Sequence, residues 1–408
     1  MKADRSFSFE GDTIDGRASM IQVITSCRKQ GAGDAGTLEI QANDISFTGP
    51  LQINSTTLGR GKGGTVTMDA AGSVTFAGEV PGGQAAKIRV ATAFKGEGAG
   101  DAGKLEIKAG NILFKDGASV NSTTYGMGKG GEVILKAADS VTFTGEGHDG
   151  EYSGVKVASD YKGEDAGDAG NLLIRAKDIS FISGASVNST TYGKGRGGEV
   201  VLRADGTVSF SGEGSAREGS NIQVASEYRE QGAGDAGTLI IQAENISLAN
   251  GAFIDSGTRG KGMGGSVTLE ADGMISLSGA DTRGKVSRIY AGSESRAGNA
   301  GTGGKISVSA RILSLSDGTA ISTSGMGGGK AGDIEIVADR VFLDTGAMIA
   351  SGMRLSMLTL LLIYQKGTAV SWYPGMWWKS QIPVTADLKA MFTPVTWQGS
   401  PGFTRLKI

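Results

Sequence analysis

The residue types that most often carry chemistry are scarce in this chain, because histidine and cysteine occur once each. His148 lies in an acidic, glycine-rich stretch, where we expect a solvated loop residue rather than a catalytic base. Cys27 alone cannot form an internal disulfide framework or a multi-cysteine metal site. We therefore expect neither Ser-His-Asp nor Cys-His catalysis, and no cofactor.

A glycine–aspartate motif offers carboxylates at regular spacing. Gly-Asp-Ala-Gly recurs with its aspartate at Asp34, Asp101, Asp168 and Asp235, each 67 residues after the previous one. Glycine–aspartate repeats bind calcium in β-rolls, but those sites use a nine-residue tandem period with ligands from adjacent turns. Carboxylates spread over the longer period cannot share one ion, so we predict a structural turn.

Basic residues recur in glycine-rich loops with the same period. If the loops stack, their cations form one positive stripe, which could bind a sulfated or uronic-acid glycan. The alternative is a solvated rim, because cations ~9.6 Å apart in water repel each other by only about 0.4 kcal/mol. The predicted stripe comprises Arg60, Lys62, Lys129, Lys194, Arg196, Arg259, Lys261 and Lys330.

A third recurring motif is Asn-Ser-Thr-Thr, which begins at Asn54, Asn121 and Asn188 and is degraded to Asp-Ser-Gly-Thr at Asp255. Its side chains could form a flat hydroxyl surface that binds ice or sugar, and its asparagines match the N-glycosylation pattern. We favour a structural role, in which Asn and Thr end a strand at a corner through side-chain hydrogen bonds.

These motifs belong to an internal repeat of 67 residues, which runs without insertion or deletion for about 340 residues. Each period holds two similar units, 28 residues over 37–64 and 39 residues over 65–103. Both units open with an apolar–polar alternation and contain two further short alternating runs. The extra length of the second unit is expected in a loop around residues 78–87.

The alternation predicts β-strands, because successive side chains of a strand point to opposite faces. In the first unit Leu38, Ile40, Ile45, Phe47 and Ile53 should point inward. Glycine, 69 of 408 residues, should mark turns where φ is positive or backbones crowd. We predict an all-β fold, a right-handed parallel β-helix (solenoid) of roughly ten three-stranded coils with a 67-residue double-coil repeat.

The repeat region is predicted to span residues 5–353. Residues 6–9 align with 73–76, so the first coil should begin in its middle. Residues 354–408 break the period and hold all four tryptophans. This tail could cap the last coil, but an abrupt change within a unit favours a frameshifted reading.

Net charge and hydropathy limit the classes of partner that we expect. A net charge of −2 gives no electrostatic reason to expect a nucleic-acid partner or an anionic membrane. No signal peptide is visible, and no apolar run is long enough to span a bilayer.

The pattern Gly-Asp-Ala-Gly-x-Leu-x-Ile-x-Ala-x-x-Ile-Ser-Phe, followed by Gly-Ala-x-x-x-Ser-x-Thr, resembles the repeats of filamentous haemagglutinin-like exoproteins. Residues 167–191 and 234–258 show it most fully. The resemblance implies a bacterial adhesin of two-partner secretion, secreted or attached to the cell surface, that passes through an outer-membrane pore partner. The family's N-terminal secretion domain is not found, so a fragment is expected.

An enzyme is the competing class, since polysaccharide lyases and hydrolases also use parallel β-helices. Such chemistry needs a locally unique cluster of carboxylates. Here almost every acidic residue has a counterpart one period away. We therefore predict a non-enzymatic adhesive shaft that contacts a glycan or another cell-surface ligand, and not a polysaccharide-degrading enzyme.

Overall fold

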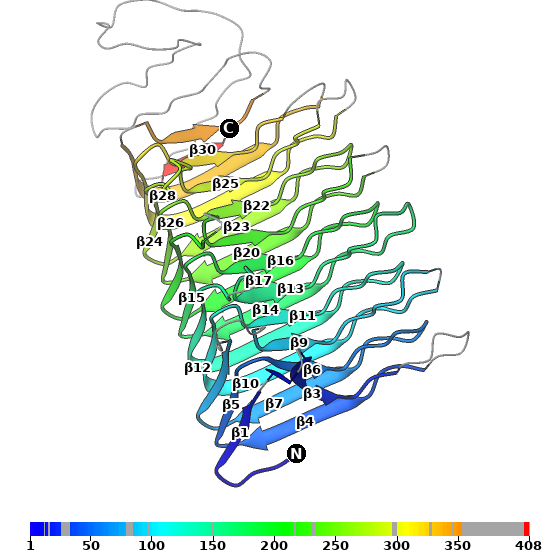
Figure 1. Cartoon of the computed structure of the whole chain (residues 1–408). Coiled ribbons are helices and arrows are strands. Elements are labelled where there is room, and N and C mark those ends of the chain that lie inside the picture. Colours follow the sequence, from blue (N-terminus) through cyan, green and yellow to red (C-terminus); the bar gives the residue numbers. More distant parts are fainter. Residues whose placement is uncertain are drawn as a thin grey trace, which may run out of the picture.

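The computed structural model shows an all-β protein whose strands pair mainly in parallel (Figure 1). It describes residues 1–11, 13–14, 17–25, 33–78, 85–96, 98–147, 150–215, 218–229, 233–295, 300–325, 329–344, 346–352 and 404–407. Within these ranges there are strands, bridges, turns and bends, and no helix.

A set of three strand segments recurs ten times between residues 37 and 350, and we call one set with its loops a coil. The first coil consists of β4 (Thr37–Ala42), β5 (Asp44–Thr48) and β6 (Leu51–Asn54). In four coils one continuous strand covers the first two segments. The other coils are β7 (Thr65–Ala70), β8 (Ser73–Ala77) and β9 (Lys87–Arg89); β10 (Lys104–Lys115) and β11 (Ser119–Asn121); β12 (Glu132–Thr144) and β13 (Gly154–Lys156); β14 (Asn171–Ala176), β15 (Asp178–Ile182) and β16 (Ser186–Asn188); β17 (Glu199–Ala204), β18 (Thr207–Ser211) and β19 (Asn221–Gln223); β20 (Thr238–Ala243), β21 (Asn245–Ala249) and β22 (Phe253–Asp255); β23 (Ser266–Ala271), β24 (Met274–Ser278) and β25 (Arg288–Tyr290); β26 (Lys305–Leu315) and β27 (Ala320–Ser322); β28 (Asp333–Leu343) and β29 (Met348–Ala350).

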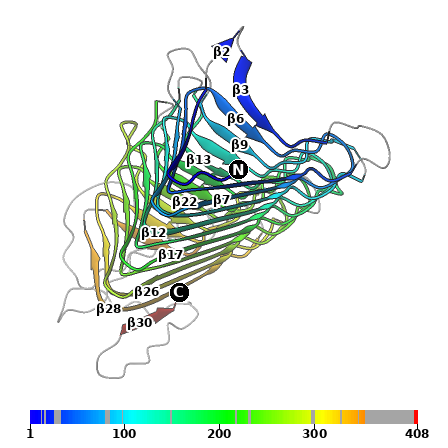
Figure 2. The same ribbon diagram turned by 90° about the horizontal axis from the view of Figure 1, so that it is seen from below.

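Each strand pairs in parallel with the equivalent strand of the next coil, and the coils lie one behind another as a series of offset, roughly triangular outlines (Figure 2). Ile40 lies opposite Met68, which in turn lies opposite Ile107. The first and second segments of all coils belong to one 18-stranded sheet, and the third segments belong to a 12-stranded sheet. Residues one coil apart along the chain are therefore direct neighbours in space.

The core consists of the inward-pointing side chains of the alternating strands. Leu38, Ile40, Ile45, Phe47 and Ile53 are all buried, as the sequence predicts. Phenylalanines at one level of the core stack ring on ring, with centroids 4.8–5.1 Å apart and planes within 2–13° of parallel. Each such pair contributes about 0.5–1.5 kcal/mol beyond its buried area. The stacked rings are those of Phe47, Phe76, Phe114, Phe143, Phe181 and Phe210.

Glycine is required at the corner between the third segment of one coil and the first segment of the next. The reason is backbone crowding, and not a positive φ. A Cβ added at Gly170 would overlap the carbonyl oxygen of Gly131, and one at Gly128 would overlap that of Gly100. The backbones of successive coils thus lie too close at this corner for any side chain. One such column runs through Gly61, Gly100, Gly128, Gly167, Gly195, Gly234, Gly262, Gly301 and Gly329.

The extra residues of the longer coils lie in two loops, where the sequence predicts one. β9 begins ten residues after β8 ends, whereas β6 begins three residues after β5 ends. The corner after the third strand is also longer, because β9 ends at Arg89 and the next strand begins at Lys104. Short antiparallel bridges, such as Glu146 with Tyr152, close the first of these loops.

At the first coil, β1 (Ser6–Glu10) pairs with β5 so that Phe7 faces Ile45 and Phe9 faces Phe47, which confirms the predicted alignment. β2 (Thr13–Ile14) and β3 (Arg17–Gln22) form an antiparallel pair, and β3 also pairs with β6.

At the last coil, β30 (Thr404–Lys407) pairs antiparallel with residues 335–338 of β28. Residues 353–403, including the four tryptophans, lie outside the described residues. The division at residues 353 and 354, and the choice between cap and frameshift, therefore remain predictions.

Replacing Gly170 by alanine should destabilise the stack, because the new Cβ meets backbone atoms that cannot move independently. We expect the free energy of unfolding to fall by about 1–3 kcal/mol, the usual range for overpacking. Urea unfolding followed by far-UV circular dichroism measures it. Gly325→Ala is the control, since its Cβ would lie 3.5 Å or more from its nearest neighbours, Lys330 and Gly329. Equal losses in the two variants would show that crowding is not the reason for glycine here.

Candidate functional site

The aspartate of the Gly-Asp-Ala-Gly motif caps the glycine-rich basic loop of the next coil. Its Oδ1 accepts the backbone N–H of the residue 28 positions later, at 2.9 Å from Asp101 to Lys129 and 2.9 Å from Asp168 to Arg196. Asp34 and Asp235 make the same contact with Lys62 and Met263. The structural-turn prediction is confirmed: the two motifs form one hydrogen-bonded corner.

The cations of this corner do not stack on one another. Asp101 lies between Lys62 and Lys129, because residues one period apart are two coils apart. The Lys62 Nζ is 3.9 Å from the Asp101 carboxylate, and the Lys129 Nζ is 3.5 Å from that of Asp168. The column containing Lys62, Lys129, Arg196 and Lys330 therefore alternates with carboxylates over much of its length. The predicted stripe thus has carboxylates between its cations.

The remaining predicted cations lie two or four residues before this column in the loops. Lys194 pairs with Glu164 at 2.8 Å, and Arg259 pairs with two glutamates. Within the described part of the chain, ion pairs are absent from Arg60, Arg196, Lys261 and Lys330. No observation tests glycan binding by these residues, which stays a prediction.

The Asn-Ser-Thr-Thr motif forms the neighbouring corner, and its hydroxyl groups are buried. Ser122 and Thr124 are fully buried, and the Ser122 hydroxyl donates to the carbonyl oxygen of Gly103. The Asn121 Oδ1 accepts the backbone N–H of Thr123 at 3.1 Å. This geometry agrees with the predicted corner and leaves no exposed hydroxyl face for ice or sugar.

Where this motif changes to Asp-Ser-Gly-Thr, the structure contains a cluster of charged side chains that was not predicted from the sequence. Arg259 lies between the carboxylates of Glu227, at 2.7 Å from Nη1, and Glu294, at 3.4 Å from Nε. Asp255 and Tyr290 line the same small hollow. Asp255 and Arg259 occupy the positions of Asn188 and Tyr192 in the preceding repeat. These two changes were the only sign of the cluster in the sequence.

Two carboxyl groups in this cluster have a raised pKa. Burial raises the pKa of the Asp255 carboxyl, and the charge of Glu294 adds to the rise, although the N–H of Gly257 opposes it. Burial likewise raises the pKa of the Glu227 carboxyl, against the charge of Arg259.

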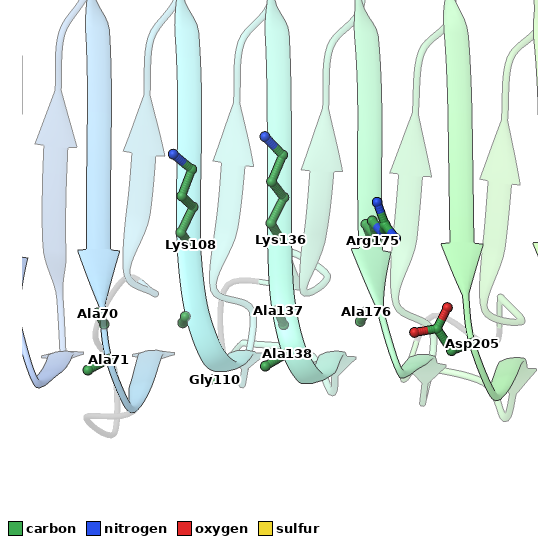
Figure 3. Close-up of a pocket in the computed structure, with 11 residues that line it drawn as sticks. Ala70, Ala71, Lys108, Gly110, Lys136, Ala137, Ala138, Arg175, Ala176 and Asp205 are labelled. Atoms are coloured by element: carbon green, nitrogen blue, oxygen red, sulfur yellow. The ribbon is translucent and has the colours of Figure 1, made fainter.

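A second feature missed at the sequence level is an uninterrupted ladder of cations on the large sheet. Lys108, Lys136, Arg175 and Arg203 occupy the same position in four successive coils and are all exposed. At about 4.8 Å between paired strands, neighbouring charges repel each other by about 0.9 kcal/mol even in water. Figure 3 shows Lys108, Lys136 and Arg175 projecting from adjacent strands.

These cations line a hollow surface that we call the sheet groove. Its two adjoining parts have volumes of about 490 and 640 Å³, and Arg175 and Asp205 line both. An alanine follows each cation, and Ala137 and Ala176 line the floor in Figure 3. Small side chains thus leave room where the strands bend toward the second segment.

Carboxylates line the groove as well as cations: Asp205, Glu244, Glu270 and Asp272 equal the four cations in number. Glu106 accepts a hydrogen bond from Lys136 at 3.2 Å and lies 3.4 Å from Lys108. Burial raises the pKa of the Glu106 carboxyl, but the hydrogen bond and charge of Lys136, with the charge of Lys108, hold it below its ordinary value. Arg175 and Arg203 form no ion pair within the described ranges.

His148 and Cys27 lie outside the described residues. Among the residues that are described, no group of three or more His, Cys, Asp or Glu side chains is arranged to hold a metal ion. The same residues contain no helix long and apolar enough to cross a membrane.

Replacing Asp168 by alanine should lower the free energy of unfolding by about 1 kcal/mol, because the N–H of Arg196 loses its acceptor. Asp168→Asn keeps an acceptor and loses only the exposed contact with Lys129, so it should retain most of the stability. Urea midpoints of the two variants and the parent chain test this. An asparagine variant as unstable as the alanine variant would mean that the ion pair matters and the cap does not.

Replacing Asp255 by asparagine should stabilise the fold at pH 7. Because the carboxyl pKa is raised in the folded chain, its stabilising contribution is fully present below its ordinary value of 3.8 and is lost as the pH rises through the raised value. The difference in stability between the variant and the parent should therefore disappear on acidification to about pH 3. Thermal melts across this range measure it, and Asn188→Asp is the reverse exchange, expected to destabilise at pH 7. A stability difference that does not change with pH would contradict the raised pKa of the Asp255 carboxyl.

No protein-family model, curated protein or solved structure matches the chain. The described geometry therefore carries the functional proposal.

Proposed function

We propose that the chain is a right-handed parallel β-helix that serves as the non-enzymatic, adhesive shaft of a secreted or cell-surface bacterial protein, related to filamentous haemagglutinin-like exoproteins. The observation that carries this proposal is the unbroken parallel register of ten coils, which repeats each surface feature along one axis. Transport through an outer-membrane pore partner is part of the same proposal and depends on the sequence resemblance.

The distribution of charge supports binding along a surface. The ladder of four cations uses the same strand position in four coils, so its contacts are extended and similar rather than convergent. A catalytic site needs unlike groups held around one reacting atom. An extended row of like groups suits many weak contacts with a long ligand, whose strengths combine.

A polysaccharide-degrading enzyme is the second candidate, and the cluster around Arg259 is the observation that favours it. Three carboxyl groups gather there, and two of them have a raised pKa, as general acids do. However, Arg259 contacts both glutamates directly, which suits a structural clamp across three coils.

A combined binding and turnover assay separates the two functions. The full chain should be retained on a glycan array and should release no reducing sugar from the glycans it binds. Glu294→Gln should leave both results unchanged, since the shaft does not require that carboxylate for chemistry. Release of reducing sugar by the parent chain that disappears in Glu294→Gln would replace the shaft with an enzyme.

A further inference from the structure

We propose that the outer face of the large sheet docks a second copy of this chain, side by side and with the two stacks running in the same direction. The contact is made by an apolar stripe that has unlike charges along its two edges. The inference does not depend on the proposed function, because it concerns contacts between copies of the chain and not a glycan ligand.

The apolar stripe consists of outward-facing residues on four successive coils. Strand pairing places Ile134 beside Leu173, Leu173 beside Val201, and Val201 beside Ile240. Each of the four lies between two buried residues of its strand, so its side chain points away from the core, and each is partly exposed. Covering these side chains with another apolar surface removes them from water, which is favourable.

The stripe is a local departure from the polar outer face of the neighbouring coils. The same strand position holds Glu106 before Ile134 and Thr268 after Ile240. The apolar surface therefore begins and ends within the sheet.

The two edges of the stripe differ in charge. Residues two positions before and two positions after a stripe residue lie on the same face of the sheet, about 6.6 Å to either side. One edge is acidic or polar and the other is mainly basic. The first edge consists of Glu132, Asn171, Glu199 and Thr238, and the second consists of Lys136, Arg175, Arg203 and Gln242.

Three of the edge charges are available to a partner. Glu199, Arg175 and Arg203 are exposed, and they form no ion pair within the described part of the chain. At the neighbouring coil the charges are already paired, since Lys104 lies 3.0 Å from Glu132, and Lys136 lies 3.2 Å from Glu106. A second copy supplies both an apolar stripe and the unlike charges that these three groups lack.

Charge decides the direction of the second copy. Two facing sheets can align their stripes with the stacks in the same direction or in opposite directions. In the opposite arrangement the acidic edges face each other, and so do the basic edges. In the same-direction arrangement each acidic edge faces the basic edge of the other copy, so the pair of Glu199 with Arg203 forms twice about a two-fold axis.

The surrounding charge permits this approach. Carboxylates and cations line the sheet groove in equal numbers, so the face has no excess charge that would drive two copies apart. The stripe is short, about 14 Å between its first and last strands. The interface is therefore small, and we expect a dissociation constant in the micromolar range.

Sedimentation velocity of the full chain tests the contact. From about 1 to 200 μM, a monomer should convert to a dimer as the concentration rises. The double variant Leu173→Lys with Val201→Lys places like charges in both stripes and should weaken the dimer at least about tenfold. Both side chains point outward, and far-UV circular dichroism checks that the variant folds.

The matched control is Ile182→Lys with Met274→Lys, which makes the same change at two outward-facing apolar residues of the second segment, 36% and 40% exposed. Its dimer affinity should stay within about twofold of the parent. A parent chain that stays monomeric throughout the range would overturn the proposal, and so would equal weakening by the stripe variant and the control.

Charge reversal tests the direction of the second copy. Glu199→Arg and Arg203→Glu should each weaken the dimer at least about tenfold, because each sets like charges opposite one another twice. Combining both reversals in one chain restores unlike pairs and should return the affinity to within about threefold of the parent. A combined variant as weak as the single reversals would overturn the same-direction contact.

Discussion

The backbone hydrogen bonds between coils are the constraint on which the rest of this structure depends. Each strand must present its N–H and C=O groups to the equivalent strand of the next coil, because buried backbone groups need partners. Successive coils are therefore held about 4.8 Å apart in parallel register. Every other feature follows from residues being repeated at that spacing: glycine where the backbones nearly touch, phenylalanine where rings can stack, and serine or threonine at the buried corners.

The same constraint decides how charge is distributed. Coils of 28 and 39 residues alternate, so a residue and its copy one period later are separated by an intervening coil. At the glycine-rich corner that coil contributes an aspartate, which caps the loop of the following coil and lies near the lysine of the preceding one. On the sheet face four successive coils supply a cation at one strand position, whereas the neighbouring coils supply Asp69 before them and Gln242 and Glu270 after them.

Much of the fold could be predicted from the sequence, because alternation within a strand and the spacing of glycines are local signals. The inward residues of the first coil and the alignment of Phe7 and Phe9 are examples. The functional surface was harder to predict. An alignment with a period of 67 residues matches Lys62 with Lys129 and does not show that Asp101 lies between them. The pairing of Lys108 with Lys136 is found only when each short unit is aligned with the neighbouring long unit. The cluster at Arg259 depends on side-chain contacts across three coils, which no spacing rule contains.

The stacked rings in the core also have a mechanical meaning. Because the hydrogen bonds between coils run along the stack, a pull on its two ends loads every coil–coil interface in series, and the weakest one yields first. The ring column passes from Phe210 to Leu248 at the junction of β18 and β21, where an aromatic pair is replaced by an aromatic–aliphatic contact. Beyond this junction the column continues as Leu248, Leu277, Leu315 and Leu343, so under tension the coils that follow it would separate before the coils that precede it.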